Sequence, residues 1–87
     1  MREKLIKYVS RNANYMNSDE MVEVICRYKE TNPTLDEMIE FYCDLYEIFV
    51  ELYIKEEDED RLKQLGSCTY VLKNFIVSTL LQKRQQA

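Results

Sequence analysis

The sequence of 87 residues contains no histidine, one glycine and one proline. The absence of histidine removes the commonest general base and the commonest transition-metal ligand. Gly66 alone cannot build the glycine-rich loop that holds phosphate groups, and the serines and cysteines have no imidazole to activate them. The acidic run at 56–60 lacks the glycine and the spaced oxygen ligands of a calcium loop. We therefore predict that the protein is not an enzyme and that it binds no cofactor and no metal.

The scarcity of glycine and proline also argues against β structure, because strands and tight turns generally need more of both. Since 46 % of the residues are hydrophobic, the chain has enough apolar surface to bury and should fold. At this length there is room for one domain, with a stability margin that a partner subunit would increase. The sequence thus favours one small helical domain.

Three features of the sequence indicate the compartment. The cysteines are odd in number and are widely spaced, at Cys26, Cys43 and Cys68, so they form neither a paired disulfide framework nor a metal knuckle. The N-terminal residues MREKLIKYVSR contain no secretory apolar region. The apolar segment 75–81 is far shorter than the roughly 20 residues that span a bilayer. We expect a soluble cytoplasmic protein without a membrane segment.

Hydrophobic periodicity predicts two helices in the first third of the chain. Apolar residues at helical spacing mark residues 2–16 as an amphipathic helix; they are Leu5, Val9, Ala13 and Met16. Ser18 is followed by two acidic residues and has the form of an N-cap. A second, short helix is therefore predicted over residues 19–31.

The segment TNPTLDE separates the second helix from the third. Pro33 disfavours helical backbone at the residue before it, and Thr34 with Glu37 three residues later has the form of a capping box. A third helix is therefore predicted over residues 35–55. The acidic residues 56–60 can either continue this helix or form a turn.

The last predicted helix covers residues 60–82. Its evidence is a series of residues at alternating steps of three and four; they are Leu62, Leu65, Thr69, Leu72, Ile76 and Thr79. No repeat or linker divides the chain, so residues 1–87 are expected to form a single domain. The predicted fold class is all-α, a small bundle of three or four helices completed by homodimerisation.

Six carboxylates share one side of the third predicted helix and form what we name the acidic stripe. Its residues are Asp36, Glu37, Glu40, Asp44, Glu47 and Glu51. At 100° per residue, five of them fall within an arc of about 80°, with Glu37 at its edge, and extend roughly 22 Å. Like charges four residues apart destabilise a helix, so the stripe needs an explanation.

Two interpretations of the acidic stripe remain open. In the first, it is a solvated face, partly neutralised by basic residues of other helices; the candidates are Lys4, Lys7, Arg11, Arg61, Lys63 and Lys73. In the second, it faces outward and binds a basic partner. Charge is strongly segregated along the chain, with a net charge of +3 in residues 1–15, −12 in residues 16–60 and +5 in residues 61–87.

The remaining circumference of the third helix, about 220°, is almost wholly apolar, which is wider than the apolar face of an ordinary surface helix. This helix should therefore be central in its own bundle or covered by a second subunit. On one side Tyr42, Tyr46, Phe49 and Tyr53 form an aromatic ridge. The ridge is either core or dimer interface, or it lines a peptide-binding groove.

These patterns favour a small acidic non-enzymatic regulatory protein that acts by contact with another protein. In this interpretation the acidic stripe inhibits a basic, nucleic-acid-binding partner. The alternative is an adaptor, chaperone or antitoxin-like module that binds a partner through the aromatic, apolar helix face. Direct nucleic-acid binding is disfavoured, because phosphate would repel the acidic third helix. The composition is typical of AT-rich genomes, such as those of low-GC bacteria and their phages.

Overall fold

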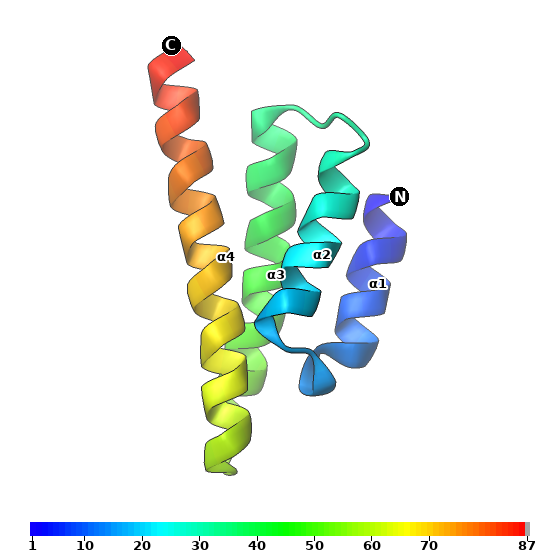
Figure 1. The fold of residues 1–87 in the computed structure, drawn as a ribbon, viewed down its shortest axis with the longest axis vertical. Coiled ribbons are helices and arrows are strands. Elements are labelled where there is room, and N and C mark those ends of the chain that lie inside the picture. The colour runs from blue at the N-terminus through cyan, green and yellow to red at the C-terminus, as the bar shows by residue number, and fades with distance from the viewer. Residues whose placement is uncertain (87) are drawn as a thin grey trace.

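The structure is a computed structural model that describes residues 1–86. Its elements are α1 (Arg2–Asn12), the 3-10 turn η1 (Ala13–Tyr15), α2 (Ser18–Lys29), α3 (Leu35–Lys55) and α4 (Glu59–Gln86). No strand occurs in this part of the chain. Figure 1 shows α3 and α4 antiparallel, with α2 in front of α3. The predicted all-α bundle, with four helices, is confirmed.

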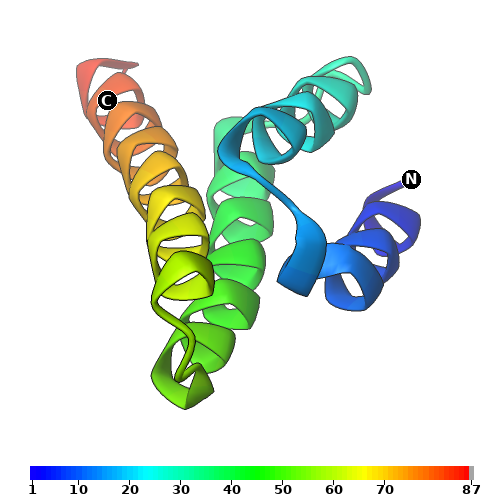
Figure 2. The same cartoon turned by 60° about the horizontal axis from the view of Figure 1, so that its bottom comes forward.

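α3 is the central helix of the bundle. It contacts α1, η1 and α4, and its contact with α4 is the most extensive between any two elements. Tyr28 of α2 stacks on Phe41 of α3, with ring centroids 4.0 Å apart. Figures 1 and 2 both place α1 at the side of α3 away from α4. Much of the wide apolar face of α3 is therefore covered by its own bundle.

The hydrophobic core takes residues from every element. From α1, η1 and the residue that follows it come Leu5, Val9, Ala13 and Met16; from α2, Met21, Val24, Ile25 and Tyr28; from α3, Phe41, Tyr42, Leu45 and Phe49; from α4, Leu65, Cys68 and Leu72. Because the apolar face of α1 points inward, its basic residues Lys4, Lys7 and Arg11 are exposed on the opposite side.

The N-terminus of α2 corrects the predicted cap. Asn17, and not Ser18, is the N-cap: its side chain accepts a hydrogen bond from the Glu20 backbone N–H at 2.9 Å, and the Glu20 carboxylate accepts from the Asn17 N–H at 3.2 Å. The physical reason is the residue three positions later. Counting from Ser18 reaches Met21, which has no carboxylate to complete a capping box.

The predicted capping box of α3 is confirmed. Thr34 Oγ1 accepts from the Glu37 N–H at 3.1 Å, and the Glu37 carboxylate accepts from the Thr34 N–H at 3.0 Å. Before it, the chain turns at Asn32, which has a φ of 57°. Asparagine tolerates this left-handed conformation better than most residues, so α2 can end here without glycine.

Three helix ends differ from the predicted boundaries. α1 ends at Asn12, whose side-chain amide donates to the Tyr8 carbonyl at 2.8 Å, and the chain tightens into η1. α2 ends at Lys29. α4 continues to Gln86, because glutamine, lysine and arginine are good helix formers and nothing after residue 82 interrupts them.

The acidic run after α3 forms a turn. α3 ends at Lys55, and Glu56 has extended backbone, with φ −80° and ψ 137°. α4 begins at Glu59, and the Leu62 N–H bonds to the Asp58 carbonyl at 2.9 Å. Three residues thus join α3 to α4, and the two helices form an antiparallel hairpin.

Candidate functional site

The acidic stripe lies on the part of α3 that its neighbours leave open. Asp36, Glu37, Glu40, Glu47 and Glu51 are exposed and Asp44 is half-buried. The reason is the position of the core residues of α3, which occupy the opposite side of the same helix. The six predicted carboxylates therefore share one surface.

Two residues of the stripe are engaged in ion pairs within the chain. Arg2 binds Asp44, with both side chains about two-fifths exposed. Lys83, near the end of α4, binds Asp36, near the start of α3. Neither basic residue was among those that the sequence offered as neutralising groups. Arg61 was one of the neutralising residues that the sequence suggested, but it contacts Glu56 at 3.9 Å and lies over the Tyr15 ring.

The ion pair of Lys83 with Asp36 could have been predicted from the sequence, whereas that of Arg2 with Asp44 could not. In an antiparallel hairpin with a short connection, the end of α4 must lie beside the start of α3, so a lysine near residue 83 can reach Asp36. Arg2 at the start of α1 has no such local rule. Its contact with Asp44 follows from how α1 packs against α3 in three dimensions.

Glu37 has a structural role within the stripe. Its carboxylate closes the capping box, and the hydrogen bonds from the backbone and side chain of Thr34 lower the pKa of Glu37 from its usual value. This carboxylate is therefore already committed to the end of the helix.

Glu40, Glu47 and Glu51 form the unneutralised part of the stripe. All three are exposed, and no ion pair within residues 1–86 involves them. Their spacing corresponds to about 10 Å and about 6 Å along the helix axis. The result is a short row of negative charge whose spacing can match basic groups on the helix or groove of another molecule.

The aromatic ridge is divided between the interior and the surface. Tyr42 and Phe49 are fully buried, Tyr46 is half-buried, and Tyr53 is 45 % exposed. Tyr42 packs against Phe75 of α4, with ring centroids 5.6 Å apart. The two buried residues belong to the core of this chain and cannot line an open groove.

Tyr42 has an unusual environment within that core. Its hydroxyl oxygen is buried and makes no hydrogen bond with any described residue. Burial, with smaller contributions from Tyr28 and Cys26, raises the pKa of Tyr42 to about 12. Burying a hydroxyl without a partner is unfavourable.

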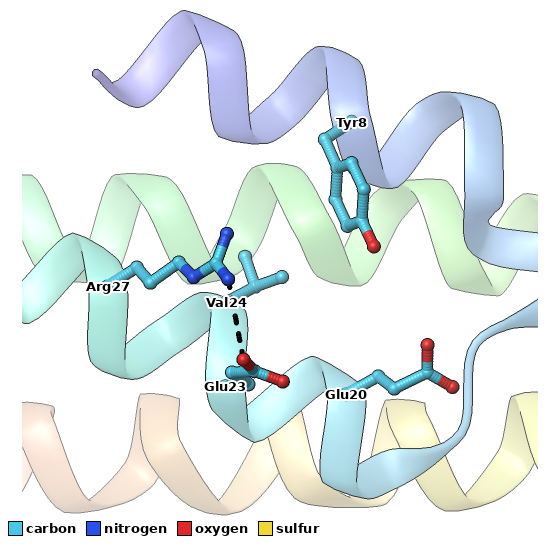
Figure 3. A pocket seen from close by; sticks show the side chains of 5 residues that line it. All are labelled: Tyr8, Glu20, Glu23, Val24 and Arg27. Carbon is cyan, nitrogen blue, oxygen red and sulfur yellow. Dashed lines mark hydrogen bonds and ion pairs between the residues drawn. The ribbon is translucent and has the colours of Figure 1, made fainter.

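Of two surface depressions on the described residues, the smaller lies outside the predicted site and the larger is bordered by Glu51 of the acidic stripe. Figure 3 shows the smaller one, about 40 Å³, between α1 and α2, where Arg27 contacts Glu23 at 3.4 Å. The larger, about 240 Å³, is lined by Ser10, Ile48, Glu51, Leu52 and Lys55. It is open and below the size of ordinary small-molecule pockets, about 300–1,000 Å³.

The cysteines differ in accessibility. Cys26 and Cys43 are exposed, whereas Cys68 is buried, and burial raises the pKa of the Cys68 thiol to about 11. Within residues 1–86 no three histidine, cysteine, aspartate or glutamate side chains are grouped so that they could hold a metal ion.

Comparison of the chain with protein-family profiles, with curated proteins and with solved structures gave no match. None of the helices in the described part of the chain is long and apolar enough to cross a membrane.

Proposed function

We propose that this protein is a small, acidic, non-enzymatic regulator that acts in the cytoplasm by contact with a basic protein, through the acidic stripe of α3. The observation that carries this proposal is the exposed row of Glu40, Glu47 and Glu51, which no basic residue of the described chain neutralises. Repulsion between Glu47 and Glu51, four residues apart, destabilises α3 by a few tenths of a kcal/mol. A partner that supplies positive charge would remove this repulsion.

The chemistry of the stripe favours a particular class of partner. Proteins that bind nucleic acid present lysine and arginine along a groove that follows phosphate groups. The open row of carboxylates from Glu40 to Glu51, about 16 Å long, can occupy such a groove and keep nucleic acid out. Association driven by opposite charges is fast and weakens as salt screens it. The proposed mode of action is therefore inhibition of a nucleic-acid-binding protein.

The aromatic ridge is the less favoured working surface. An adaptor or chaperone function would require its side chains on an accessible face, but Tyr42 and Phe49 are fully buried. The proposal also includes self-association, since Ile54, Leu80 and Leu81 are among the large apolar side chains that remain exposed. A domain of this size gains stability from a partner subunit.

The experiment compares two triple variants that change the net charge equally. One replaces Glu40, Glu47 and Glu51 with Gln. The control replaces three other exposed acids, Glu3, Glu30 and Glu57, with Gln. Binding of a fluorescent helical peptide rich in lysine and arginine is measured by anisotropy at several salt concentrations, with circular dichroism to verify folding.

We expect the wild type and the control to bind the peptide with an affinity that falls as salt rises, and the stripe variant to bind at least tenfold more weakly. The wild type, but not the stripe variant, should also displace an oligonucleotide from a basic DNA-binding domain. Equal losses in the two triple variants would mean that net charge, and not the stripe, governs binding. That result would reject the proposal.

A further inference from the structure

One side of the α3–α4 hairpin is left uncovered by α1 and α2, and we name it the outer face. On α3, Phe41 points toward α2 and Tyr53 toward α4, where a Cβ on Gly66 would lie 3.5 Å from its ring. Continuing around α3 at 100° per residue beyond Tyr53, the positions are, in order, Tyr46, Ile39, Val50, Cys43 and Ile54. Ile54 is 74 % exposed. These residues therefore lie on the side of the hairpin away from α2.

The residues of α4 can be placed around its axis in the same way. Two contacts fix the rotational orientation of α4 about its own axis. The Phe75 ring lies under the Lys29 ammonium group of α2 at 5.0 Å, and Gly66 lies beside α3. Beyond Gly66 in the same rotational direction come Val77, Tyr70 and Leu81. All three are exposed, Tyr70 to 65 %. The outer face thus carries apolar side chains from both helices.

The two halves of the outer face differ in charge. On α3 it includes Glu40 and Glu47 of the acidic stripe and no basic residue, and on α4 it includes Lys63, Lys73 and Arg84. Residues 61–87 contain no acidic residue at all. One half is apolar and negative, and the other is apolar and positive.

We propose that a second copy of this chain covers the outer face, with α3 of each copy lying over α4 of the other in an antiparallel four-helix arrangement. The inference deepens the self-association in the proposed function and rests on it. Two hairpins can stack face to face about a twofold axis in two ways. An axis across the helices sets α3 on α3 and α4 on α4, so that like charges meet. An axis along the helices sets each α3 over an α4, so that opposite charges meet.

The axis along the helices also gives a consistent register. Within one copy, Asp36 is level with Lys83 and Tyr53 with Gly66, so Glu47 is level with the turn that holds Lys73. Rotation about an axis parallel to the helices preserves height. Glu47 of one copy is therefore level with the turn of α4 that carries Lys73 in the second copy.

The outer face is large enough for a stable dimer. α3 is about 31 Å long, and two packed helices present a width of about 20 Å, which gives a footprint of about 600 Å². Stable interfaces bury about 800 Å² of accessible surface per partner, and the rough surface of a helix pair exceeds its footprint. Contact through α4 alone would cover about half of this and would bring two basic helices together.

The arrangement makes the second copy a competitor for the stripe. Glu40 and Glu47 would lie at the edge of the dimer interface, so a basic protein and a second copy would use the same carboxylates. Dimerisation would make these carboxylates less available, so the apparent affinity of the protein for a basic partner would fall as the dimer forms.

A charge-swap experiment tests the pairing. One variant carries Glu40→Lys and Glu47→Lys, and the other carries Lys73→Glu and Arg84→Glu. Control variants make the same charge changes on exposed residues away from the outer face, at Glu3 and Glu30 or at Lys4 and Lys7. Sedimentation equilibrium gives the masses, and circular dichroism verifies that each variant is folded.

We expect the wild type and the controls to sediment at about twice the chain mass of 10.5 kDa and each swap variant alone to dimerise at least tenfold more weakly. An equimolar mixture of the two swap variants should regain the dimer, because both α3–α4 contacts between copies are again of opposite charge. A monomeric wild type, swap variants that dimerise as the wild type does, or a mixture no better than its components would overturn the inference. A monomeric wild type that still binds the basic peptide would reject self-association and leave the binding of a basic protein through the acidic stripe intact, whereas a dimer that binds no peptide would reject that binding alone.

Discussion

Replacing Tyr42 with Phe should stabilise the protein. The Tyr42 ring is fully buried between α3 and α4, and its hydroxyl oxygen makes no hydrogen bond with the described residues. The substitution removes this one polar atom and keeps the ring, so the packing against Phe75 is preserved. The neighbouring Tyr28 is the matched control, because its buried hydroxyl donates to the Glu37 carbonyl at 3.4 Å.

The magnitude follows from the environment of each hydroxyl. Burying a hydroxyl without a hydrogen bond costs about 1–3 kcal/mol in proteins. Tyr42→Phe removes this penalty but leaves a small void, so we expect a net gain of about 1 kcal/mol in the free energy of unfolding. For a domain of this size the melting temperature should rise by about 4–8 °C. Tyr28→Phe removes a hydrogen bond and should lower stability by up to about 1 kcal/mol.

The stability that Tyr42→Phe gains over the wild type should also depend on pH, because Tyr42 has different pKa values in the folded and unfolded states. The pKa of Tyr42 is about 12 in the folded protein and about 10 when the chain is unfolded. Between these values the unfolded state releases the Tyr42 proton while the folded state keeps it, so the wild type loses stability as pH rises. Tyr42→Phe has no such proton, and its advantage over the wild type should grow from pH 10 to pH 12.

The assay is urea unfolding of the wild type and both variants at neutral pH and at several values above pH 9, monitored by circular dichroism. Taking the difference between variant and wild type at each pH cancels the titration of the other tyrosines and of the lysines. A Tyr42→Phe protein less stable than the wild type would show that the hydroxyl has a partner, such as an ordered water. An advantage that stayed constant through pH 12 would refute the linkage argument.

Two further predictions concern the core. Phe49→Ala should lower the free energy of unfolding by about 3–5 kcal/mol, because the Phe49 side chain is fully buried in the core. Tyr53→Ala, at a half-exposed position, serves as the comparison in denaturant titration, and an unchanged melting temperature for Phe49→Ala would place Phe49 outside the core. An alkylating reagent should label Cys26 in the native protein and reach Cys68 only on unfolding, because Cys26 is exposed, whereas Cys68 is buried and its pKa is raised to about 11. Mass spectrometry that found Cys68 labelled as fast as Cys26 in the native state would contradict its burial.

The sequence was most informative where local chemistry decides the structure. The start of α3 could be predicted, because Pro33, Thr34 and Glu37 act within one turn of the chain. The cap of α2 was misplaced by one residue, since Asn17 and Ser18 are both suitable caps and only the position of Glu20 distinguishes them. The end of α4 was placed too early because the prediction stopped with the apolar residues, whereas helix propensity alone extends it.

The sequence could group the candidate site residues but could not say which of them are covered. Helical geometry places the acidic stripe and the aromatic ridge on two sides of α3, whatever surrounds it. Burial within the ridge depends on the register of α4: Phe75 lies against Tyr42, whereas Tyr53 lies beside Gly66, which has no side chain to cover it. The ion pairs made by Arg2 and Lys83 likewise depend on how the helices pack in space.

The short connection between α3 and α4 has a consequence for how the chain folds. The most extensive contact in the bundle joins two helices separated by only three residues, so bringing them together requires closure of a very small loop, which occurs within about 10–100 ns. Proteins dominated by such local contacts fold in microseconds to milliseconds. The hairpin is thus the natural nucleus of folding, with α1 and α2 docking afterwards onto a surface that α3 and α4 have already formed. Interactions of α1 would then be made mainly after the transition state, and weakening them should accelerate unfolding and leave the folding rate nearly unchanged.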